Sequence, residues 1–308
     1  MTPTTYRAYG FAAVGGPDQE LFLDLPIPTP GPEDLLVEVR AAGVNPADWK
    51  VRQGHSGAPE ALPAVLGREV SGVVRAVGRD VDGFSEGDEV FGTTAPGSGG
   101  YAEYTLLTAA ATAPKPPQVS WTDAAALPVS AGTAYDGLHE LALPAGSTLL
   151  VIGVGGGVGV ALAQLARNAG IAVFGTASES KRELVESLGV TLVGYRDGVA
   201  DRVRELLPGG VDAVFDLVGG DALRAAAELA ADRSRLVSIA DKALVAELGG
   251  HDVTRRRTTA VYAEVAALVA RGELDPHVGD VRPLDEAGQA LAGVESGHAR
   301  GKVVLRVG

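Results

Sequence analysis

The residues with the clearest chemical potential are glycines that follow a short apolar stretch near the middle of the chain. Residues 149–152 are all aliphatic, and residues 153–159 read GVGGGVG. A strand-sized apolar stretch, a glycine run and the apolar segment 158–169 together predict a strand, a tight loop and a helix. Glycine has no side chain, so the backbone of such a loop can approach a phosphate. The following helix N-terminus supplies free N–H groups and a positive dipole end.

These glycines have two interpretations. Gly153, Gly156 and Gly159 are spaced by three residues, which differs from the strict dinucleotide pattern G-x-G-x-x-G. A tight turn between a strand and a helix also favours glycine for steric reasons alone. The alternating strand and helix setting favours the cofactor interpretation. We therefore expect the loop residues to bind a dinucleotide, namely Gly153, Gly155, Gly156, Gly157, Val158 and Gly159.

The end of the next expected strand, residues 171–176, indicates which dinucleotide would bind. Chains that bind NAD usually carry an acidic residue there, which holds the ribose hydroxyls. Residues 174–178 read FGTAS and contain no acid. Ser178 can donate to a 2′-phosphate, and Lys181 and Arg182 add cationic groups. These features favour NADPH, although Lys181 and Arg182 also fit an ordinary solvated helix face, with Glu179 among them.

Metal-ligand chemistry has little support in the sequence. The chain has no cysteine, which excludes disulfides and thiolate metal ligands. Its five histidines have no ligand-like spacing. We expect each to be a surface or loop residue, and we expect no metal site; the histidines are His55, His139, His251, His277 and His298.

The elements that must position these residues fall into three stretches. Up to Lys115, short apolar segments separated by Pro and Gly predict strands at 35–40, 70–77, 89–91 and 102–107. From Trp121 onward strands and helices alternate, which predicts a parallel sheet with helices on both faces. The strands of this part are expected at 149–152, 171–176, 211–217 and 235–239, and the helices at 158–169, 180–188 and 221–231. Two helices, 259–271 and 285–295, and a strand at 302–307 complete the chain.

Composition and charge exclude several classes of function. A length of 308 residues is enough for two domains with full cores. The net charge of −13 argues against a nucleic-acid partner. No apolar run is long enough to cross a bilayer, and the N-terminus lacks a signal-peptide pattern, so we expect a cytoplasmic protein without a membrane partner. The basic cluster at 255–257 is expected to be solvated or to form local salt bridges.

Several motifs in a fixed order resemble the zinc-independent medium-chain dehydrogenases/reductases. The resemblance covers nearly the whole chain and is strongest to quinone oxidoreductases of the zeta-crystallin type and to related alkenal and enone reductases. The segments that carry it are GVNPADWK (43–50), LGREVSGVV (66–74), GDEVFG (87–92), AALP (125–128), GTAY (132–135), the glycine loop, DLVGG (216–220) and GKVVL (301–305).

The resemblance implies an α/β fold made of a Rossmann doubly wound parallel sheet and a GroES-like, β-rich catalytic domain. The catalytic domain would occupy residues 1–119 and 255–308, and the NADPH-binding domain residues 120–254. The implied reaction transfers a hydride from NADPH to a quinone or an α,β-unsaturated carbonyl. Asn45 stands at the position of a zinc-ligating cysteine and Arg68-Glu69 replaces a His-Glu pair, so zinc is not expected. The usual assembly of the family is a homodimer.

Individual roles also follow from the resemblance. Asn45 would lie near the nicotinamide and donate to a developing oxyanion, and Lys50 would polarise the carbonyl or supply a proton. Asn45 also fits a turn residue before Pro46, and Lys50 also fits a surface lysine beside Trp49. Further cofactor contacts are implied for Thr133, Tyr195, Val218, Ser238, Ile239 and Lys302. Of these, Lys302 would reach a pyrophosphate oxygen, and Thr133 also fits a small packing residue.

Two features depart from the family pattern, and two other functions stay open. The segment 242–259 is short and irregular, and Arg68 would either bind an acidic substrate group or pair with Glu69 or Asp88. One alternative function is a medium-chain alcohol dehydrogenase, which the missing metal ligands disfavour. The other is an NADPH-binding protein without turnover, acting as a sensor or a structural protein.

Overall fold

The computed structural model describes residues 4–308 except 56–58, 60, 195–197 and 298. The chain forms two compact units. The β-rich unit runs to Val129 and also takes up Arg257–Arg271 and Pro276–Gly308. The α/β unit comprises Ser130–Arg256 and Gly272–Asp275. The sequence analysis places the first boundary after residue 119 and the second after residue 254, and the units of the structure change over at 129 and 256.

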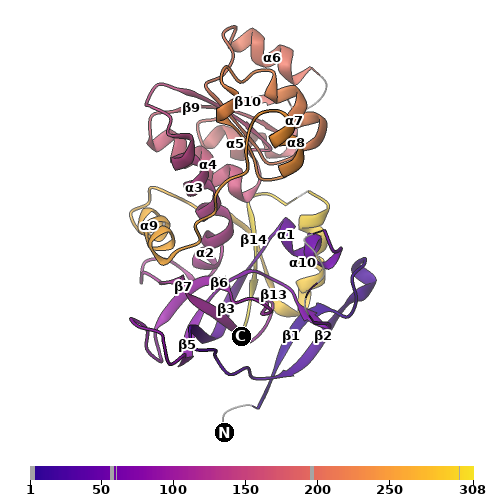
Figure 1. Cartoon of the computed structure of the whole chain (residues 1–308), viewed down its shortest axis with the longest axis vertical. Helices are drawn as coiled ribbons and strands as arrows, with labels where there is room; N and C mark the ends of the chain where they lie inside the picture. The colour runs from indigo at the N-terminus through magenta and orange to yellow at the C-terminus, as the bar shows by residue number, and fades with distance from the viewer. Residues whose placement is uncertain (1–3, 56–58, 60, 195–197, 298) are drawn as a thin grey trace. The chain divides into compact units, whose positions relative to one another are not determined.

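Two sheets form the frame of the β-rich unit (Figure 1). The strands of the larger sheet are β3 (Asp34–Val44), β5 (Glu69–Val77), β6 (Glu89–Thr94), β7 (Tyr104–Pro114), β13 (Val278–Pro283) and β14 (Lys302–Arg306). Their order is β13-β14-β3-β5-β6-β7, and β3 pairs with β7 as well, so the sheet curls back on itself. The smaller sheet contains β1 (Thr5–Phe11), β2 (Glu20–Pro26) and β4 (Ala64–Val65) in the order β2-β1-β4.

Alternating side chains decide which face of β3 lies against the core. Leu35, Val37 and Val39 are at most 1% exposed, whereas Glu38 and Arg40 remain partly exposed. Side chains at alternate positions of a strand point to opposite faces, so this face of β3 is the one that lies against the core. The buried face packs with aliphatic residues of β5, β7 and β14 in one core cluster.

Four α-helices accompany these sheets: α1 (Pro46–Arg52), α2 (Trp121–Ala125), α9 (Thr259–Ala270) and α10 (Ala287–Glu295). Ser120 caps α2, because its Oγ accepts a hydrogen bond from the Asp123 N–H at 3.0 Å. Pro46 begins α1, where its missing N–H costs nothing. A π-helical turn at Leu127–Ala131 follows α2.

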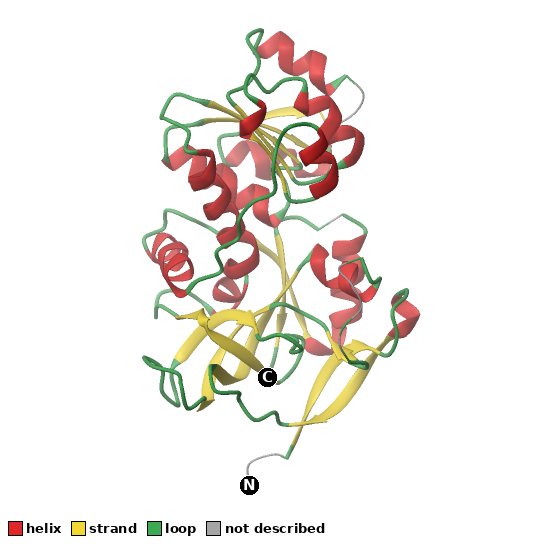
Figure 2. Ribbon diagram, in the orientation of Figure 1, coloured by secondary structure: helices red, strands yellow, loops and turns green. Residues whose placement is uncertain are grey.

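The α/β unit is a five-stranded parallel sheet with helices on both faces (Figure 2). Its strands are β8 (Thr148–Ile152), β9 (Ala172–Ala177), β10 (Thr191–Gly194), β11 (Ala213–Asp216) and β12 (Leu236–Ser238). Its helices are α3 (Gly132–Leu141), α4 (Gly157–Asn168), α5 (Arg182–Ser187), α6 (Val199–Leu206), α7 (Gly220–Ala227) and α8 (Lys242–Glu247). The strand order is β10-β9-β8-β11-β12. From β8 the chain adds strands first on one side and then on the other, which is the doubly wound arrangement predicted from the sequence.

The segment 242–259 is more regular than expected. Asp241 caps α8 through a 3.1 Å bond from the Leu244 N–H to its Oδ1. His251 then runs parallel to β12, donating its N–H to the Leu236 carbonyl at 3.0 Å and accepting from the Ser238 N–H at 3.1 Å. Arg255 pairs with Asp252, and Arg256 pairs with Asp136, which confirms the local salt bridges expected at 255–257.

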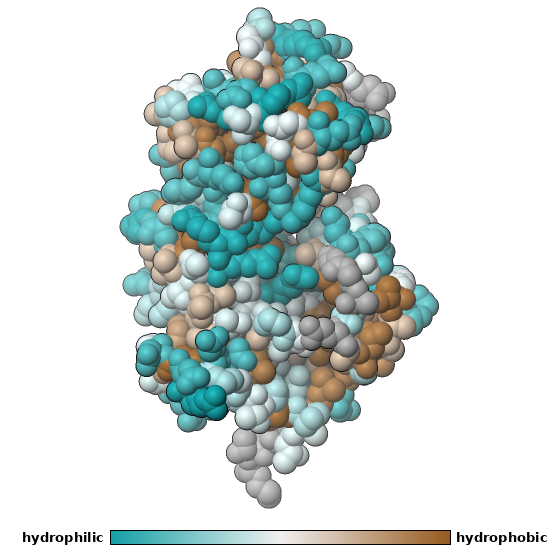
Figure 3. Space-filling view, in the orientation of Figure 1, coloured by the Kyte–Doolittle hydropathy of each residue, from teal (hydrophilic) through white to brown (hydrophobic). Residues whose placement is uncertain are grey.

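The surface agrees with the acidic composition. Hydrophilic residues cover most of the visible face of the α/β unit (Figure 3). Among the described residues, few large hydrophobic side chains are exposed, and Val218, at 58%, is the most exposed of them. Within the same residues, no helix is long and apolar enough to cross a membrane.

Candidate active site

The glycine loop joins β8 to α4 by a very short path. Gly153 has a φ of +87°, a conformation that other residues rarely adopt, and its N–H donates to Thr176 Oγ1 at 3.0 Å. A Cβ on Gly159 would lie 2.4 Å from the Val154 carbonyl oxygen, so only glycine lets α4 approach the loop. The first N–H groups of α4 have no partner within the helix and are suited to bind an anion.

The glycine at the centre of the loop is not required by close packing. Gly156 is the N-cap of α4, and a Cβ built there would meet its nearest neighbour, the Gly153 carbonyl oxygen, only at 3.8 Å. Glycine at this position is therefore not needed for packing inside the chain. The approach of an external group gives a reason for it, and this cradle fits the pyrophosphate of a dinucleotide.

Lys181 lies against the same loop. A Cβ on Gly155 would be 2.7 Å from Lys181 Cδ, so the aliphatic part of the lysine side chain packs against this glycine. Ser178 follows the end of β9, and its Oγ is 3.0 Å from Ser180 Oγ. Arg182 is already engaged with Glu179 at 2.6 Å and Glu186 at 2.7 Å on an exposed surface. Arg182 therefore fits the alternative of an ordinary solvated helix face, whereas the side chain of Lys181 lies beside the glycine loop.

A carboxylate at the end of β11 holds the neighbouring loop. Asp216 is fully buried, and its Oδ1 accepts from the N–H groups of Val218 and Gly219, each at 3.1 Å. Its Oδ2 accepts from the Gly219 N–H at 2.9 Å and from Ser238 Oγ at 2.7 Å. The sequence analysis notes Asp216 only as part of a motif. The signal that would have singled it out is an acid at the C-terminal end of a buried strand.

The other residues expected to contact a cofactor in this unit have different environments. Val218 lies next to the glycine loop, since a Cβ on Gly153 would be 2.9 Å from Val218 Cγ2. Ile239 follows β12 and donates its N–H to the Asp216 carbonyl at 3.1 Å. Thr133 is buried within α3, a setting that suits the alternative of a packing residue. Tyr195 lies outside the described residues.

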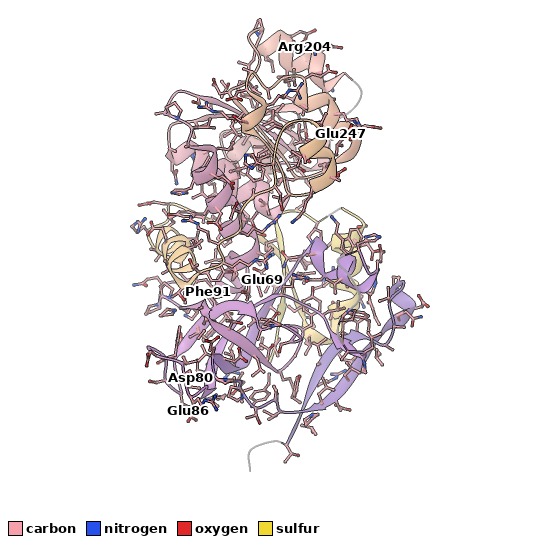
Figure 4. All side chains as sticks on the ribbon, in the orientation of Figure 1. Glu69, Asp80, Glu86, Phe91, Arg204 and Glu247 are labelled. Carbon is pink, nitrogen blue, oxygen red and sulfur yellow. The ribbon has the colours of Figure 1, made fainter. Side chains whose placement is uncertain are left out.

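The β-rich unit contains a buried charged cluster made of Asn45, Glu69 and Lys302, each at most 3% exposed. Lys302 Nζ lies 2.5 Å from Glu69 Oε1 and 2.5 Å from Asn45 Oδ1. Asn45 Nδ2 donates to Glu69 Oε1 at 2.8 Å, so the two neighbours fix the orientation of its amide. The Val129 N–H donates to the second oxygen of Glu69 at 2.7 Å. Figure 4 labels Glu69, the first residue of β5.

The chain makes space for this cluster through one glycine. A Cβ on Gly43 would lie 2.2 Å from Glu69 Oε1 and 2.5 Å from the Ala125 carbonyl oxygen. Strand β14 brings Lys302 to the cluster because Val303 pairs with Val44 at the end of β3. Three segments far apart in sequence thus converge on one ion pair.

Asp48 forms a second layer behind Asn45. Its Oδ2 accepts from the Asn45 N–H and from Tyr101 Oη, both at 2.8 Å. Its Oδ1 is buried without a hydrogen-bond partner among the described residues. Burial raises the pKa of Asp48 to about 6, although the hydrogen bonds from Tyr101 and Asn45 lower it in part. The same burial, together with the Asp48 charge, raises the pKa of Tyr101 well above its ordinary value.

Helix α1 carries Lys50 and is anchored by Arg52. Arg52 is 1% exposed and pairs with Glu20 of β2 and, at 3.0 Å, with Glu295 of α10. Lys50 is only partly buried, and its Nζ lies 5.6 Å from the Trp49 ring centroid. This contact matches the alternative of a lysine beside Trp49, and it leaves a catalytic role of Lys50 as a prediction.

The placement of Lys302 differs from the expected one. Its ammonium faces Glu69, Asn45 and, at 3.5 Å, the Val44 carbonyl. Three buried oxygens already surround it, so contact with a pyrophosphate would require it to leave an ion pair. The ion pair that Glu69 forms in the structure is with Lys302 and not with Arg68, one of the partners that the sequence had suggested.

Metal-binding geometry is absent where it can be assessed. Among the described residues, no group of three or more His, Asp and Glu side chains is arranged to hold a metal ion. His251 Nε2 contacts the Ser234 carbonyl and His139 Nδ1 the Tyr135 carbonyl, while His298 lies outside the described part of the chain. These two contacts are with backbone atoms, as in ordinary loop and helix-end histidines.

One unit of the chain has a parallel sheet with a glycine cradle, and the other has a β-rich fold with a buried polar cluster. This combination is typical of nicotinamide-dinucleotide oxidoreductases. Comparison with known families agrees. Residues 31–117 match the alcohol dehydrogenase GroES-like domain, and residues 188–305 match the zinc-binding dehydrogenase family. The chain belongs to the medium-chain dehydrogenase/reductase family, as its full-length relatives show.

Two of these relatives are enzymes with named activities. The quinone oxidoreductase of Lama guanicoe is 31% identical over 97% of this chain and 97% of its own length. The 2-methylene-furan-3-one reductase of Solanum lycopersicum is 32% identical over 98% of this chain and 79% of its own length.

Solved structures show the same fold over the whole chain. The quinone oxidoreductase of Coxiella burnetii has a TM-score of 0.89 at 29% identity, covering 99% of this chain and all of that one. A mycobacterial protein in complex with NADPH has a TM-score of 0.86 at 30% identity, covering 98% and 99%. An NAD-dependent alcohol dehydrogenase has a TM-score of 0.86 at 32% identity, covering 98% and 100%. The predicted fold class and family are thereby confirmed, and the family binds NAD or NADP.

Proposed function

We propose that this chain reduces quinones or α,β-unsaturated carbonyls with NADPH and without zinc. The observation that carries the proposal is the ammonium of Lys302, which lies 2.5 Å from both Glu69 Oε1 and Asn45 Oδ1. These are the residues that stand at or beside the family's metal-ligand positions. The ammonium of Lys302, which is part of the chain, would take the place of a bound metal cation.

Zinc does not fit these residues. A catalytic zinc needs about three protein ligands and an open position, and here the available oxygens already surround an ammonium. A site without a Lewis acid suits an acceptor that is activated by its own conjugation, such as a quinone or an enone. The names of the quinone oxidoreductase and furanone reductase relatives support the same class of acceptor.

The preference for NADPH rests on the end of β9. A 2′-phosphate requires donors and positive charge. Ser178 supplies a hydroxyl, and the stem of Lys181 runs across Gly155 beside the cradle. Residues 174–178 contain no acid that would repel a phosphate or bind ribose hydroxyls.

The residues of the chain would bind, orient and supply a proton. When bound, NADPH supplies a hydride from its nicotinamide ring. Val218 and the backbone of Ser238 and Ile239 would flank that ring at the carboxyl edge of the sheet. Asn45 would exchange its long 3.5 Å contact with the Gly43 carbonyl for a hydrogen bond to the substrate oxygen. Lys50 would supply the proton that the reduced acceptor needs.

Oxidation of NADPH across a panel of acceptors tests the proposal. The panel contains 1,4-benzoquinone, naphthoquinones, alkenals, cyclic enones and enoyl thioesters. We expect turnover with at least one quinone or enone class. If no acceptor is reduced although NADPH binds tightly, the result would instead support the alternative of a non-catalytic NADPH-binding protein.

Alcohol dehydrogenation is the second candidate function. The structural similarity to an NAD-dependent alcohol dehydrogenase favours it. It predicts reduction of NAD or NADP by primary or secondary alcohols, with activity that depends on added zinc. The same protein preparation, assayed with alcohols with and without zinc, separates the two functions.

Asn45→Ala and Lys50→Ala test the catalytic roles. Both variants are expected to lower kcat by about 10²-fold or more, the range of general acid–base and oxyanion contributions. NADPH affinity should change little. If both variants keep full activity on every accepted substrate, neither residue is catalytic.

The remaining proposals concern partners and assembly. Besides NADPH, the proposed reaction requires a small-molecule acceptor. We also propose a homodimer and a cytoplasmic location, the first of which light scattering coupled to gel filtration would test directly.

A further inference from the structure

Two loops at the carboxyl edge of the parallel sheet are tied together by buried side chains. Asp216 ends β11 and Ser238 ends β12, and the two residues are register partners on adjacent strands. Both are fully buried. Ser238 Oγ donates to Asp216 Oδ2 at 2.7 Å, and it accepts from the N–H groups of Ala240 at 3.2 Å and Asp241 at 3.1 Å. Each residue therefore holds the loop that follows its own strand, and one short bond joins them.

We propose that Asp216, acting through Ser238, is a positioning residue that fixes the loops against which the nicotinamide end of the cofactor binds. The inference rests on the proposed function, since it assumes that a dinucleotide occupies the carboxyl edge of this sheet. Asp216 does not touch the cofactor. It sets the conformation of the residues that do.

The loop after β11 presents an exposed apolar side chain. Val218 is 58% exposed, the highest value among the large hydrophobic side chains of the described residues. Its Cγ2 is the nearest neighbour of a Cβ built on Gly153 in the glycine loop, at 2.9 Å. An apolar surface held beside a phosphate cradle is suited to the face of a flat ring whose other end carries phosphates.

The backbone of this loop would not keep its conformation unaided. Gly219 has a φ of +84° and Gly220 a φ of +55°, so this stretch is intrinsically permissive. Asp216 accepts the N–H groups of Val218 and Gly219, and Asp241 Oδ2 accepts weakly from the Gly220 N–H at 3.5 Å. Charge-assisted hydrogen bonds inside a buried site are stronger than neutral ones, which explains the use of a carboxylate.

The two oxygens of the Asp216 side chain accept from all of these donors. Val218 N–H points at Oδ1, Gly219 N–H is shared between both oxygens, and Ser238 Oγ–H points at Oδ2. An asparagine would place an NH₂ group on one side, where it would face either the backbone N–H groups or the serine hydroxyl proton. Asp216→Asn is therefore expected to release one loop, and Ser238→Ala to release the link between them.

The test compares two ligands that share one end of the cofactor. NADPH carries both the nicotinamide and the 2′-phosphate, whereas 2′,5′-ADP carries only the adenosine end. Isothermal titration calorimetry would measure both affinities for the full chain and for Asp216→Asn and Ser238→Ala. If the wild-type chain prefers NADH, the two ligands compared are NADH and ADP. The test therefore does not depend on which of the two cofactors the chain prefers.

A matched control lies at the opposite end of the same strands. Asp212 Oδ2 accepts from the Thr148 N–H at 2.7 Å and from Thr148 Oγ1 at 2.9 Å, at the amino edge of β8 and β11. Asp212→Asn removes a similar link between a carboxylate and a backbone N–H, far along the strands from the cofactor edge. Both ligands should bind this variant as they bind the wild type.

The proposal predicts a split between the two ligands. Loss of a hydrogen bond to a charged group should weaken NADPH binding about tenfold or more in Ser238→Ala. The affinity for 2′,5′-ADP should stay within about twofold of wild type, since RT ln 2 is well below the energy of one such bond. Equal loss of both ligands, or no loss of either, would overturn the proposal. If Asp216→Asn does not fold, Ser238→Ala alone decides. Failure of the wild type to bind any dinucleotide refutes the proposed function itself.

Discussion

Buried carboxylates in the β-rich unit are stabilised in two different ways. Glu69 has a cation, Lys302, within 2.5 Å, whereas Asp48 relies on hydrogen bonds from Asn45 and Tyr101. The buried charge is compensated by an opposite charge in the first case and by neutral donors in the second. The two acids of one cluster should therefore respond differently to the loss of their partners.

Asp48 should make stability depend on pH. Its pKa is about 6 in the folded chain and near 3.8 when unfolded, so the folded state binds the extra proton between these values. Its contribution to stability is most favourable below about pH 4 and falls as the pH rises to about 6. The loss amounts to roughly 3 kcal/mol. Urea unfolding of the wild type and Asp48→Asn from pH 4 to pH 7 measures it, because other groups cancel in the difference.

In that comparison the wild type should lose stability relative to Asp48→Asn as the pH rises. The asparagine keeps an oxygen for the Asn45 and Tyr101 donors and has no charge to bury. A difference that stays constant over this range would show that Asp48 is ionised throughout.

Lys302 should matter more for stability than an exposed lysine. Lys302→Met leaves the Glu69 carboxylate buried without its cation, which costs about 3–5 kcal/mol. The double variant Lys302→Met, Glu69→Gln removes both charges and should recover part of that loss. Denaturant unfolding of both variants measures the coupling. If the double variant is no more stable than Lys302→Met, the ion pair between Lys302 and Glu69 does not account for the stability that Lys302 contributes.

At the scale of elements, the glycines of the loop between β8 and α4 serve different purposes. Gly159 is needed by the fold, because a Cβ would lie 2.4 Å from the Val154 carbonyl. Gly156 has room for a Cβ and a backbone conformation that alanine tolerates, with φ −98° and ψ 170°. Its role therefore concerns what binds outside the loop.

A pair of alanine variants separates these roles. Gly159→Ala should lower stability by about 1–3 kcal/mol through overpacking. Gly156→Ala should unfold like the wild type yet bind NADPH at least about tenfold more weakly, because its methyl group occupies the approach of the phosphate. Thermal unfolding and calorimetry measure the two effects. Unchanged NADPH affinity in Gly156→Ala would place the pyrophosphate elsewhere.

Local signals account for the elements that the sequence predicts well. Residues 149–152 and 158–169 carry their own strand and helix patterns, and the structure forms β8 and α4 there. Ser120 marks the start of α2, because its side chain caps the helix. The end of α7 at Ala227 lies earlier than the expected residue 231, since helix ends depend on caps and packing that the periodicity does not encode.

At the scale of the whole molecule, the candidate site depends on pairings between distant segments. Asn45, Glu69 and Lys302 meet because β14 lies beside β3 and β3 beside β5. No local pattern specifies these antiparallel neighbours. The family resemblance therefore implies a phosphate contact for Lys302, whereas the structure pairs it with Glu69. The glycine cradle was predictable because all its parts lie within one strand, loop and helix. Its contacts with a cofactor stay predictions.

The central claim is that this chain uses NADPH, without zinc, to reduce a conjugated acceptor. The most direct measurement is kcat/KM for NADPH and for NADH, with the best quinone or enone of the panel and protein dialysed against a chelator. Charge-assisted bonds to one phosphate predict a preference for NADPH of about tenfold or more. A preference for NADH, or activity that appears only when zinc is returned, would contradict the account.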